Sequence, residues 1–364
     1  MTKKTSLLYI MGVDWSWIRQ RPHILAQELD KKFDTTVLYP TYLTRPWRRQ
    51  KRTQKPKRCK AVFQIPFESQ APLLGRMEEK IMKRAFADAD KYDMIWLCAP
   101  AYYKYVPQNY RGTVIYDCMD DNVKLQPNTV LAQRMRDNQQ ALWDRADLVF
   151  VTSQYLMDHL PEPVKGKAAL VRNGTDARRQ AMQGARPDRK SYVLGYIGTI
   201  SEWFDFDLVE ACLQKFSELK FELYGPAVVR VPAINGLCCK GVIEHGEIAQ
   251  ATKHVDCLMM PFVVNDIVLA VDPVKLYEYI SMGKCIISVE YPEVERFEPY
   301  VYFYKTKEQL LALLKMLVAR GFPPKYNAGM QQQFLDRNGW NERVNVICLE
   351  IDKCRCAKRS PIKE

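Results

Sequence analysis

The chain has 364 residues, 47% of them apolar and 26% charged, with 20 tyrosines, 14 phenylalanines and 7 tryptophans. This length is enough for about two domains of ordinary size, and such a composition excludes a disordered or low-complexity chain. The net charge of +12 would suit a nucleic-acid binder. Residues 1–190, however, carry 34 basic and 20 acidic side chains, while residues 191–364 carry 20 basic and 22 acidic ones. This uneven distribution indicates that one half alone meets an anionic partner.

Short apolar runs alternate with amphipathic stretches, which is the pattern of parallel sheets covered by helices. In the first half we predict strands at 7–13, 36–39, 61–66, 94–99, 113–118, 148–152 and 169–172, and helices at 22–29, 73–87 and 131–145. Segment 176–190 is poor in apolar residues and is typical of a linker. After it we predict strands at 192–197, 221–224, 240–243, 257–261, 285–289 and 302–304, and helices at 206–217, 247–254, 273–281, 307–319 and 330–353. The pattern indicates two Rossmann-like domains, whose ligands would bind beyond the carboxyl ends of the strands.

Residues 272–288, Asp-Pro-Val-Lys-Leu-Tyr-Glu-Tyr-Ile-Ser-Met-Gly-Lys-Cys-Ile-Ile-Ser, carry the most informative pattern. Pro273 suits the first turn of a helix, and Lys275 and Glu278 are three residues apart and therefore share a helix face. A helix N-terminus beside a lysine suits a diphosphate, and a glutamate one turn later can accept both hydroxyls of a ribose. An ordinary surface Lys–Glu pair explains the same spacing, so these residues alone leave both interpretations open.

Six further segments along the chain carry patterns that are informative together. They are 17–23 (Trp-Ile-Arg-Gln-Arg-Pro-His), 116–121 (Tyr-Asp-Cys-Met-Asp-Asp), 146–153 (Ala-Asp-Leu-Val-Phe-Val-Thr-Ser), 171–176 (Val-Arg-Asn-Gly-Thr-Asp), 195–205 (Gly-Tyr-Ile-Gly-Thr-Ile-Ser-Glu-Trp-Phe-Asp) and 338–341 (Asn-Gly-Trp-Asn). With residues 272–288 they resemble motifs of GT-B glycosyltransferases of the group 1 or family 4 type, especially bacterial transferases of teichuronic-acid, capsule and exopolysaccharide assembly. The resemblance covers nearly the whole chain.

This resemblance implies an α/β fold of the GT-B type, with two Rossmann-like domains facing a central cleft. Residues 1–178 would bind the acceptor, residues 190–330 would bind the nucleotide sugar, and a C-terminal helix at 331–364 would return to the N-terminal domain. The implied reaction transfers a sugar from a nucleotide-diphosphate sugar, most commonly a UDP-sugar, to a hydroxyl of a polyprenyl-diphosphate-linked saccharide. It needs no cofactor besides the donor substrate, and cations and backbone amides can stabilise the leaving diphosphate without a metal.

The resemblance also implies the residues of the donor site. Glu278 would bind the ribose, and the nucleobase would lie beside residues at strand ends. Residues implied for the nucleotide sugar are Gly198, Thr199, Lys275, Glu278, Arg172, Tyr224, Pro261, Phe262 and Asp272. Many retaining relatives have a first glutamate eight positions before the second, where this chain has Ala270. Asn265, Asp266 or Asp272 could take its role, and both inversion and retention stay open.

Inversion would need a general base near the acceptor hydroxyl. Asp120 and Asp121 follow a predicted strand, and two adjacent carboxylates can raise the pKa of one of them, although a capped turn explains them equally well. His23 is a second candidate, for which packing at a helix start is the alternative. Asp205 and Asp207 match a manganese-binding D-x-D pattern, but acids at a helix N-terminus explain them better.

The charge excess is concentrated in residues 45–60, which hold nine basic residues and no acidic one. The helix predicted directly afterwards has Leu74, Met77 and Ile81 at helical spacing. A basic cluster with aromatic neighbours beside an amphipathic helix is typical of binding to an anionic membrane leaflet, while a solvated loop beside a core helix is the alternative. The expected membrane contacts are Arg48, Arg49, Lys51, Arg52, Lys55, Lys57 and Arg58.

The apolar runs and the cysteines of the sequence indicate in which cellular compartment we expect the protein. No stretch approaches the roughly 20 apolar residues that span a bilayer, and the 11 cysteines are scattered without zinc-ligand spacing, as expected of reduced thiols. We therefore expect a cytoplasmic protein at the inner face of the cell membrane, with no metal and no nucleic acid bound. Two rivals remain, a nucleotide-sugar 2-epimerase of GT-B fold and an RNA-binding protein that uses the basic segment.

Overall fold

The computed structural model describes residues 4–42, 55–65, 71–126 and 128–359. The chain divides into two compact units, which we call unit 1 (Met1–Asn173 with Trp340–Glu364) and unit 2 (Gly174–Gly339). The segment at 174–190 therefore belongs to unit 2, and the residues at 331–364 are divided between the two units.

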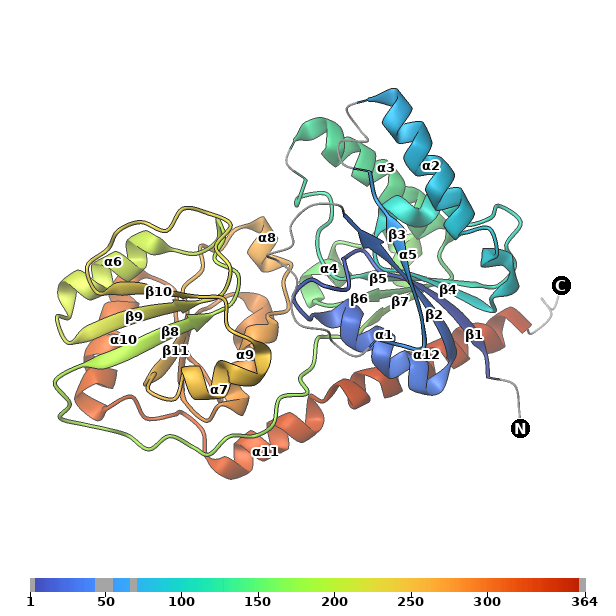
Figure 1. Cartoon of the computed structure of the whole chain (residues 1–364). Coiled ribbons are helices and arrows are strands. Elements are labelled where there is room, and N and C mark those ends of the chain that lie inside the picture. Colours follow the sequence, from blue (N-terminus) through green and yellow to red (C-terminus); the bar gives the residue numbers. More distant parts are fainter. Residues whose placement is uncertain (1–3, 43–54, 66–70, 127, 360–364) are drawn as a thin grey trace. The chain divides into compact units, whose positions relative to one another are not determined.

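Unit 1 contains a parallel sheet of seven strands in the order β3-β2-β1-β4-β5-β6-β7 (Figure 1). Its strands are β1 (Ser6–Ile10), β2 (Asp34–Thr41), β3 (Arg58–Phe63), β4 (Met94–Leu97), β5 (Thr113–Cys118), β6 (Leu148–Val151) and β7 (Ala168–Leu170). The central strands β4, β5 and β6 are buried along their whole length, whereas β3 is largely exposed. Burial on both faces explains why β4 and β6 are continuous apolar runs.

Helices cover both faces of this sheet, as the alternating pattern predicts. They are α1 (Arg21–Lys32), α2 (Pro72–Ala85), α3 (Thr129–Arg145), α4 (Gln154–Asp158), α5 (Glu162–Lys165) and α12 (Trp340–Arg359). Helix α12 lies beside α1 (Figure 1), because Trp340, Val344, Ile347 and Ile351 enter the same apolar core as Leu25 of α1. The spacing of these four residues places them on one helix face.

Unit 2 contains a second parallel sheet, with six strands in the order β10-β9-β8-β11-β12-β13. Its strands are β8 (Tyr192–Ile197), β9 (Leu219–Tyr224), β10 (Leu237–Gly241), β11 (Cys257–Met260), β12 (Cys285–Val289) and β13 (Tyr302–Tyr304). Its helices are α6 (Phe206–Lys215), α7 (Ile248–Ala251), α8 (Asp266–Leu269), α9 (Val274–Ser281), α10 (Lys307–Arg320) and α11 (Ala328–Arg337). In both units the strand order reverses beside the first strand, as in doubly wound sheets that bind nucleotides at that point.

Residues 176–190, which the sequence suggests as a linker, pack against unit 2. The backbone amides of Gln180 and Gln183 donate to Ser281 O and Gly283 O at 2.8 and 2.7 Å, and that of Arg186 donates to Gly321 O at 2.9 Å. Gly283 has φ of +66°, and a Cβ there would lie 2.6 Å from a backbone oxygen of the segment, so a glycine permits this close approach. Backbone hydrogen bonds thus fix a segment that has few apolar residues.

The structure differs from the predicted elements near the C-terminus. The predicted helix at 330–353 is two helices, because α11 ends at Arg337 and α12 begins at Trp340. Phe334 of α11 packs in the core of unit 2, whereas Trp340 packs in that of unit 1. The apolar residues of the two helices therefore serve different cores, which the combined periodicity of the sequence does not reveal.

Candidate functional site

The predicted nucleotide residues of unit 2 gather at the carboxyl edge of its sheet, where the strand order reverses between β8 and β11. Gly198 and Thr199 follow β8, and Pro261 and Phe262 follow β11. A Cβ on Gly198 would lie 3.3 Å from Lys275 Cε, so α9 passes directly beside the loop after β8. This is the position at which ligands of doubly wound sheets bind.

Lys275 and Glu278 form an ion pair on α9, with 2.9 Å between Lys275 Nζ and Glu278 Oε2. Their side chains are 30% and 16% exposed, so both are partly open to solvent. Burial, followed by the nearby Glu278 carboxylate, raises the pKa of Tyr196, whose hydroxyl donates to Thr199 O at 3.0 Å. Tyr196 thus bonds to the loop after β8 and lies within the electrostatic influence of Glu278.

Two glycines let the loops after β8 and β9 approach each other. Gly225 has φ of +140°, and a Cβ there would lie 2.0 Å from Gly198 O, so no side chain fits. Gly198 N donates to Tyr224 O at 2.8 Å. This amide is therefore occupied, and the contribution of Gly198 would be space for a ligand beside Lys275 rather than a bond to a phosphate.

The carboxylate of Asp272 is buried and bonded to neighbouring side chains. Asp272 is 3% exposed, forms an ion pair with Arg296, and accepts hydrogen bonds from Tyr277 Oη at 3.2 Å. Arg296 also pairs with Glu293 at 2.6 Å. A carboxylate held in this way anchors the start of α9 and does not face a ligand.

The other candidates for a second polar contact to the sugar lie on α8. Asn265 is the N-cap of α8, and its side-chain oxygen accepts from the amides of Ile267 and Val268 at 3.0 Å. Asp266 is exposed and is the first residue of that helix. Ala270 is buried. Among these positions, Asp266 has the most exposed carboxylate.

The residues predicted near the nucleobase differ in exposure. Tyr224 is 2% exposed, and its hydroxyl donates to Glu222, which also pairs with Lys240 at 3.0 Å. Pro261 is buried, and its carbonyl accepts from the amide of Asp205 at 2.9 Å. Phe262 keeps partial exposure. Of the three, Phe262 has the most surface for a base to stack on.

Two of the predicted acid–base residues, Asp120 and Asp121, lie in unit 1 directly after β5. Burial, followed by the negative charge of Asp117, raises the pKa of Asp120 to about 6. No residue that the structure describes forms a hydrogen bond or ion pair with the Asp120 carboxylate. Asp121 instead accepts from the amide of Lys124 at 3.1 Å and lies 3.6 Å from its ammonium. Among the described residues, the turn therefore engages the carboxylate of Asp121 and leaves that of Asp120 without a bonded partner.

A buried ion pair beside this turn was missed by the sequence reasoning. Arg21 is 3% exposed and Asp117 is fully buried, with 2.8 Å between Arg21 Nη2 and Asp117 Oδ1. The two residues belong to the motifs at 17–23 and 116–121, which is the signal that could have indicated them. Their separation by 96 residues hides the contact from any local pattern.

His23 and Arg172 also belong to unit 1. His23 is 1% exposed, its Nδ1 accepts from the amide of Gln20 at 3.4 Å, and its Nε2 lies 3.3 Å from Asp14 O. Burial lowers the pKa of His23, which favours the packing interpretation. Arg172 is half-buried at the end of β7, and its carbonyl accepts from Arg21 Nη1 at 3.3 Å.

Part of the predicted membrane segment can be located. Arg48, Arg49, Lys51 and Arg52 lie outside the described residues. Lys55 donates to Tyr39 Oη at 2.6 Å, Lys57 is exposed, and Arg58 pairs with Asp34. Two of the three described cations are therefore already bonded within unit 1.

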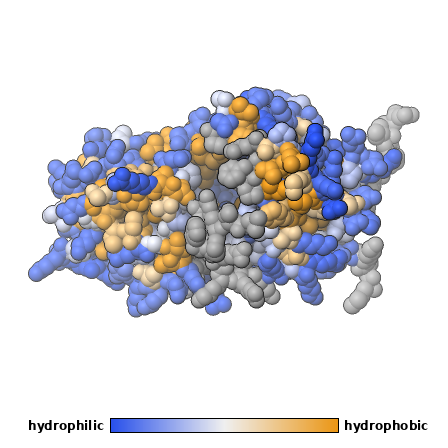
Figure 2. Space-filling model, turned by 45° about the horizontal axis from the view of Figure 1, so that its top comes forward, coloured by the Kyte–Doolittle hydropathy of each residue, from blue (hydrophilic) through white to orange (hydrophobic). Residues whose placement is uncertain are grey.

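Helix α2 carries both exposed apolar residues and cations. Leu73 and Met77 are 69% and 50% exposed, whereas Leu74 and Ile81 are half-buried, so the three predicted apolar positions do not share one environment. A shallow pocket of about 430 Å³ is lined by Arg76, Glu79, Lys80, Lys83, Arg84 and Ala87. Figure 2 shows hydrophobic and strongly hydrophilic residues side by side over α2.

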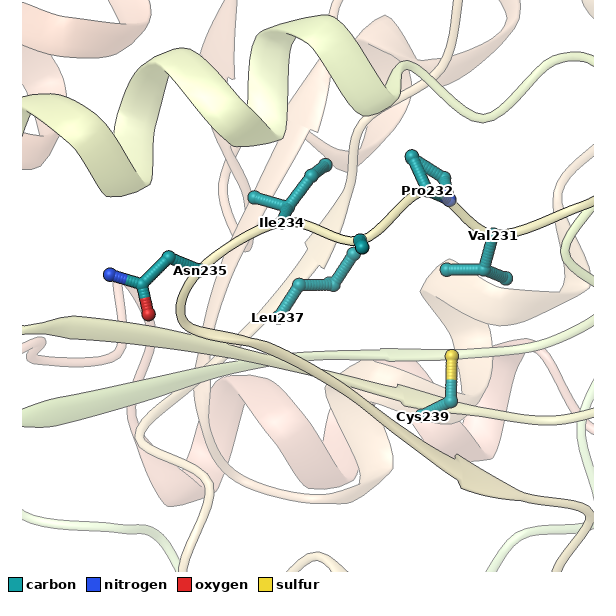
Figure 3. Close-up of a pocket in the computed structure, with 7 residues that line it drawn as sticks. Val231, Pro232, Ile234, Asn235, Leu237 and Cys239 are labelled. Atoms are coloured by element: carbon teal, nitrogen blue, oxygen red, sulfur yellow. The ribbon is translucent and has the colours of Figure 1, made fainter.

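Another pocket lies away from the predicted donor residues. It has a volume of about 490 Å³ and is lined by Val231, Pro232, Ala233, Ile234, Asn235, Leu237 and Cys239 (Figure 3). These residues precede β10 or belong to it, so the pocket does not lie beyond the carboxyl ends of the strands, where the predicted donor residues gather.

The D-x-D pattern is a helix start, as expected. Asp205 is the N-cap of α6, and its side chain accepts from the amide of Leu208 at 2.8 Å. In the described part of the chain, no group of three or more His, Cys, Asp or Glu side chains could hold a metal ion. Among the same residues, no helix combines the length and the apolar composition needed to cross a membrane.

The chain is similar to one curated glycosyltransferase. No protein-family profile matches it. A protein of Bacillus subtilis (strain 168) with the provisional name teichuronic acid biosynthesis glycosyltransferase TuaH is 27% identical over 218 residues, which are 52% of this chain and 54% of that protein. The chain thus spans about half the length of the curated relative that it matches.

Solved structures match over almost the full length. The lipopolysaccharide outer core galactosyltransferase WaaB, in its apo form, matches 97% of this chain and 100% of its own with a TM-score of 0.65 and 11% identity. Anabaena HepE in complex with UDP and glucose matches 96% of this chain and 100% of its own with a TM-score of 0.64 and 13% identity. A Listeria monocytogenes protein provisionally named UDP-N-acetylglucosamine 2-epimerase matches 99% of both chains with a TM-score of 0.53 and 11% identity. The chain therefore has the GT-B fold that its motifs predict, with two Rossmann-like units of parallel strands and helices.

Proposed function

We propose that the chain is a glycosyltransferase that moves a sugar from a nucleotide-diphosphate sugar, in the first place a UDP-sugar, to a hydroxyl of a lipid-linked saccharide in bacterial cell-surface polysaccharide synthesis. The observation that carries the proposal is the grouping of Gly198, Lys275 and Glu278 where the strand order of unit 2 reverses. The name of the Bacillus relative supports a sugar transfer in polysaccharide synthesis, and the UDP and glucose in the HepE structure support a UDP-sugar as the donor.

In this proposal unit 2 holds the donor. The Lys275 ammonium would lie against the diphosphate and stabilise the charge that develops as the sugar leaves. The start of α9 would add the partial positive charge of a helix N-terminus. Glu278 would accept hydrogen bonds from the ribose hydroxyls with its carboxylate, of which only Oε2 bonds to Lys275. These groups need no metal ion or further cofactor.

Unit 1 would provide the acceptor side, with Asp120 as the base of an inverting displacement. The acceptor oxygen forms a bond to the anomeric carbon, the bond from that carbon to the diphosphate oxygen breaks, and the hydroxyl proton passes to Asp120. A pKa of about 6 leaves this carboxylate ionised at neutral pH, and close enough to neutrality to be an effective base. Asp121 would hold the turn, while His23 would support the start of α1.

We also propose that unit 1 meets the inner, anionic face of the cell membrane, where a lipid-linked acceptor is presented. Exposed Leu73 and Met77 would insert among the headgroups, and Lys80 and Arg84 lie on the same stretch of α2. Such a mixture of apolar and basic side chains favours binding at an anionic interface. The basic residues at 45–60 would add to the attraction.

The proposal is tested by measuring the affinity for UDP and UDP-sugars by isothermal titration calorimetry. Glu278→Ala and Lys275→Ala are each expected to weaken UDP binding by about 10- to 100-fold, because each removes a charge-assisted hydrogen bond worth about 1.5–3 kcal/mol. Glu350→Ala is the matched control, since Glu350 forms a comparable pair with Lys353 at 2.8 Å on α12. If none of the nucleoside diphosphates and nucleotide sugars bound to the protein, the donor assignment would be refuted.

A nucleotide-sugar 2-epimerase is the second candidate, favoured by the structural match to the Listeria protein. An epimerase converts the nucleotide sugar without an acceptor, so NMR of UDP-N-acetylglucosamine incubated with the protein alone distinguishes the two. Formation of a 2-epimer would contradict the transferase proposal and support the epimerase. Salt-sensitive RNA binding without UDP binding would instead support the RNA-binding alternative.

A further inference from the structure

A buried cation joins three elements at the carboxyl edge of the sheet of unit 1. Arg21, the first residue of α1, donates through Nε and Nη2 to Asp117 of β5 at 2.8–3.2 Å. Its Nη1 donates to Val171 O at 2.9 Å and to Arg172 O at 3.3 Å, directly after β7. All three guanidinium nitrogens therefore have acceptors inside the unit.

Such a pair is expensive to bury unless its hydrogen bonds are complete. Arg21 is 3% exposed and Asp117 is fully buried, so neither charge is solvated by bulk water. The fork of the guanidinium satisfies both carboxylate oxygens and two carbonyls, which a lysine could not do. The arrangement therefore fixes how α1 meets the ends of β5 and β7.

The turn that carries Asp120 starts two residues after Asp117. Thr152 Oγ1 donates to Met119 O at 2.7 Å, and Asn122 Nδ2 donates to Asp120 O at 3.2 Å. These bonds hold the backbone on both sides of the candidate base. The ion pair fixes the end of β5, from which this turn continues, and the same guanidinium bonds to the backbone carbonyl of Arg172.

We propose that Arg21 and Asp117 are positioning residues of the transferase, and that their buried pair holds Asp120 and Arg172 in place at the acceptor end of unit 1. This inference rests on the proposed function. It assigns a role in the reaction to two side chains that touch neither donor nor acceptor.

The pair also sets the charge around Asp120. Among the described residues, the charged groups that act on its pKa are Asp117 from β5, Arg21 from α1 and Asp121 from its own turn. Asp117 raises the pKa of Asp120, Arg21 lowers it, and Asp121 raises it less. Changes at Arg21 and Asp117 should therefore move the pKa of Asp120 in opposite directions, which a general loosening of the fold would not do.

The test is a carboxyl titration of the full-length protein, labelled with ¹³C-aspartate, by NMR without donor or acceptor. The signal lost in Asp120→Asn identifies the group. Asp117→Asn is expected to lower its pKa by about one unit or more, and Arg21→Gln to raise it by about one unit. Asp34→Asn, which breaks an exposed pair with Arg58, is the control and should leave it unchanged.

If Asp117→Asn does not fold, the double variant Arg21→Gln/Asp117→Asn replaces it, because removing both charges leaves neither one buried alone. A smaller fall in the pKa of Asp120 is then expected, since Asp117 has the larger effect. Equal pKa values in the wild type and in both charge variants would overturn the inference. In a transfer assay, the pH at which kcat/KM falls on the acid side should be lower in Asp117→Asn and higher in Arg21→Gln than in the wild type. Arg21→Lys should keep the pH profile of the wild type but lower kcat. Absence of nucleotide binding refutes the proposed function without altering this titration, so the two failures are distinguishable.

Discussion

Asp117, Asp120 and Asp272 all stand at the end of a strand or the start of a helix, yet their carboxylates have different surroundings. Asp117 and Asp272 are buried against Arg21 and Arg296, respectively. Asp120 has no such cation bonded to it among the described residues, and burial raises its pKa. The difference depends on which distant arginine reaches each carboxylate, and this decides that one aspartate is a candidate base while the other two stabilise the fold.

Lys284 illustrates the same effect of burial on a cation, and it yields a prediction about pH. It is 4% exposed, and its ammonium donates to Gln183 Oε1 at 2.6 Å and to Val255 O at 2.7 Å. Burial lowers its pKa from 10.5 to about 8. Between these two values the unfolded chain binds more protons than the folded one, so the contribution of Lys284 to stability increases as the pH rises.

Chemical denaturation of the wild type and of Lys284→Met at several pH values checks this. The free energy of unfolding of the wild type, minus that of the variant, is expected to increase by about 2 kcal/mol between about pH 7.5 and pH 9.5, by linkage at 1.36 kcal/mol for each pKa unit. Taking the difference cancels the titration of buried cysteines and tyrosines common to both proteins. Lys253→Met, at an exposed position, should show no such change. A difference that stays constant with pH would contradict the burial of a charged Lys284.

The sequence predicts contacts within one element of the candidate site better than contacts between distant elements. Lys275 and Glu278 share a face because they are three residues apart on one helix, and their 2.9 Å pair follows from that spacing. Arg21 and Asp117 meet only through the order of strands in the sheet, and no local pattern contains that order. Burial of Asp272 likewise depends on Arg296, which lies 24 residues away. Local spacing therefore predicts pairs within a helix, but not the ion pairs that tie elements together.

At the scale of single elements, α2 is the helix that we propose to contact a membrane surface. The sequence predicts helix 73–87 and the structure has α2 at Pro72–Ala85, but the exposed apolar residues are Leu73 and Met77, while Ile81 is half-buried. Periodicity locates the helix. The face turned to solvent depends on where the sheet lies, which periodicity leaves open when both faces carry apolar residues.

Co-sedimentation with anionic and zwitterionic phospholipid vesicles tests the proposed membrane contact of α2. Lys80→Glu/Arg84→Glu is expected to reduce binding to anionic vesicles by at least about tenfold, because each cation contributes about 1 kcal/mol near such a surface. Binding should also weaken at high salt. The control Lys307→Glu/Lys315→Glu changes two exposed lysines of α10 in unit 2 and makes the same change in net charge. Equal loss in both double variants would mean that net charge alone, and not α2, governs binding.

At the scale of the whole molecule, the chain crosses between two cores twice. Unit 2 is one continuous segment, whereas unit 1 combines Met1–Asn173 with Trp340–Glu364. The alternation of strands and helices predicts both sheets, because each βα pair is a local pattern. It does not predict that α11 belongs to one core and α12 to the other. That depends on the packing of Phe334 and Trp340, which are both large and apolar and only six residues apart.

Helix α12 should therefore be required for the stability of unit 1 specifically. Ile347 is fully buried in the core of unit 1 together with residues of α1 and of the central strands, whereas Leu349, two residues later on the same helix, is 54% exposed. Ile347→Ala is expected to destabilise unit 1 by about 2–5 kcal/mol, since it leaves a cavity in a packed core, and Leu349→Ala should have little effect. Hydrogen exchange followed by mass spectrometry locates the change. Faster exchange in β1, β4 and α1 with unchanged exchange in β8, β11 and α9 is the expected result. Faster exchange spread equally over both units would mean that they unfold as one cooperative body.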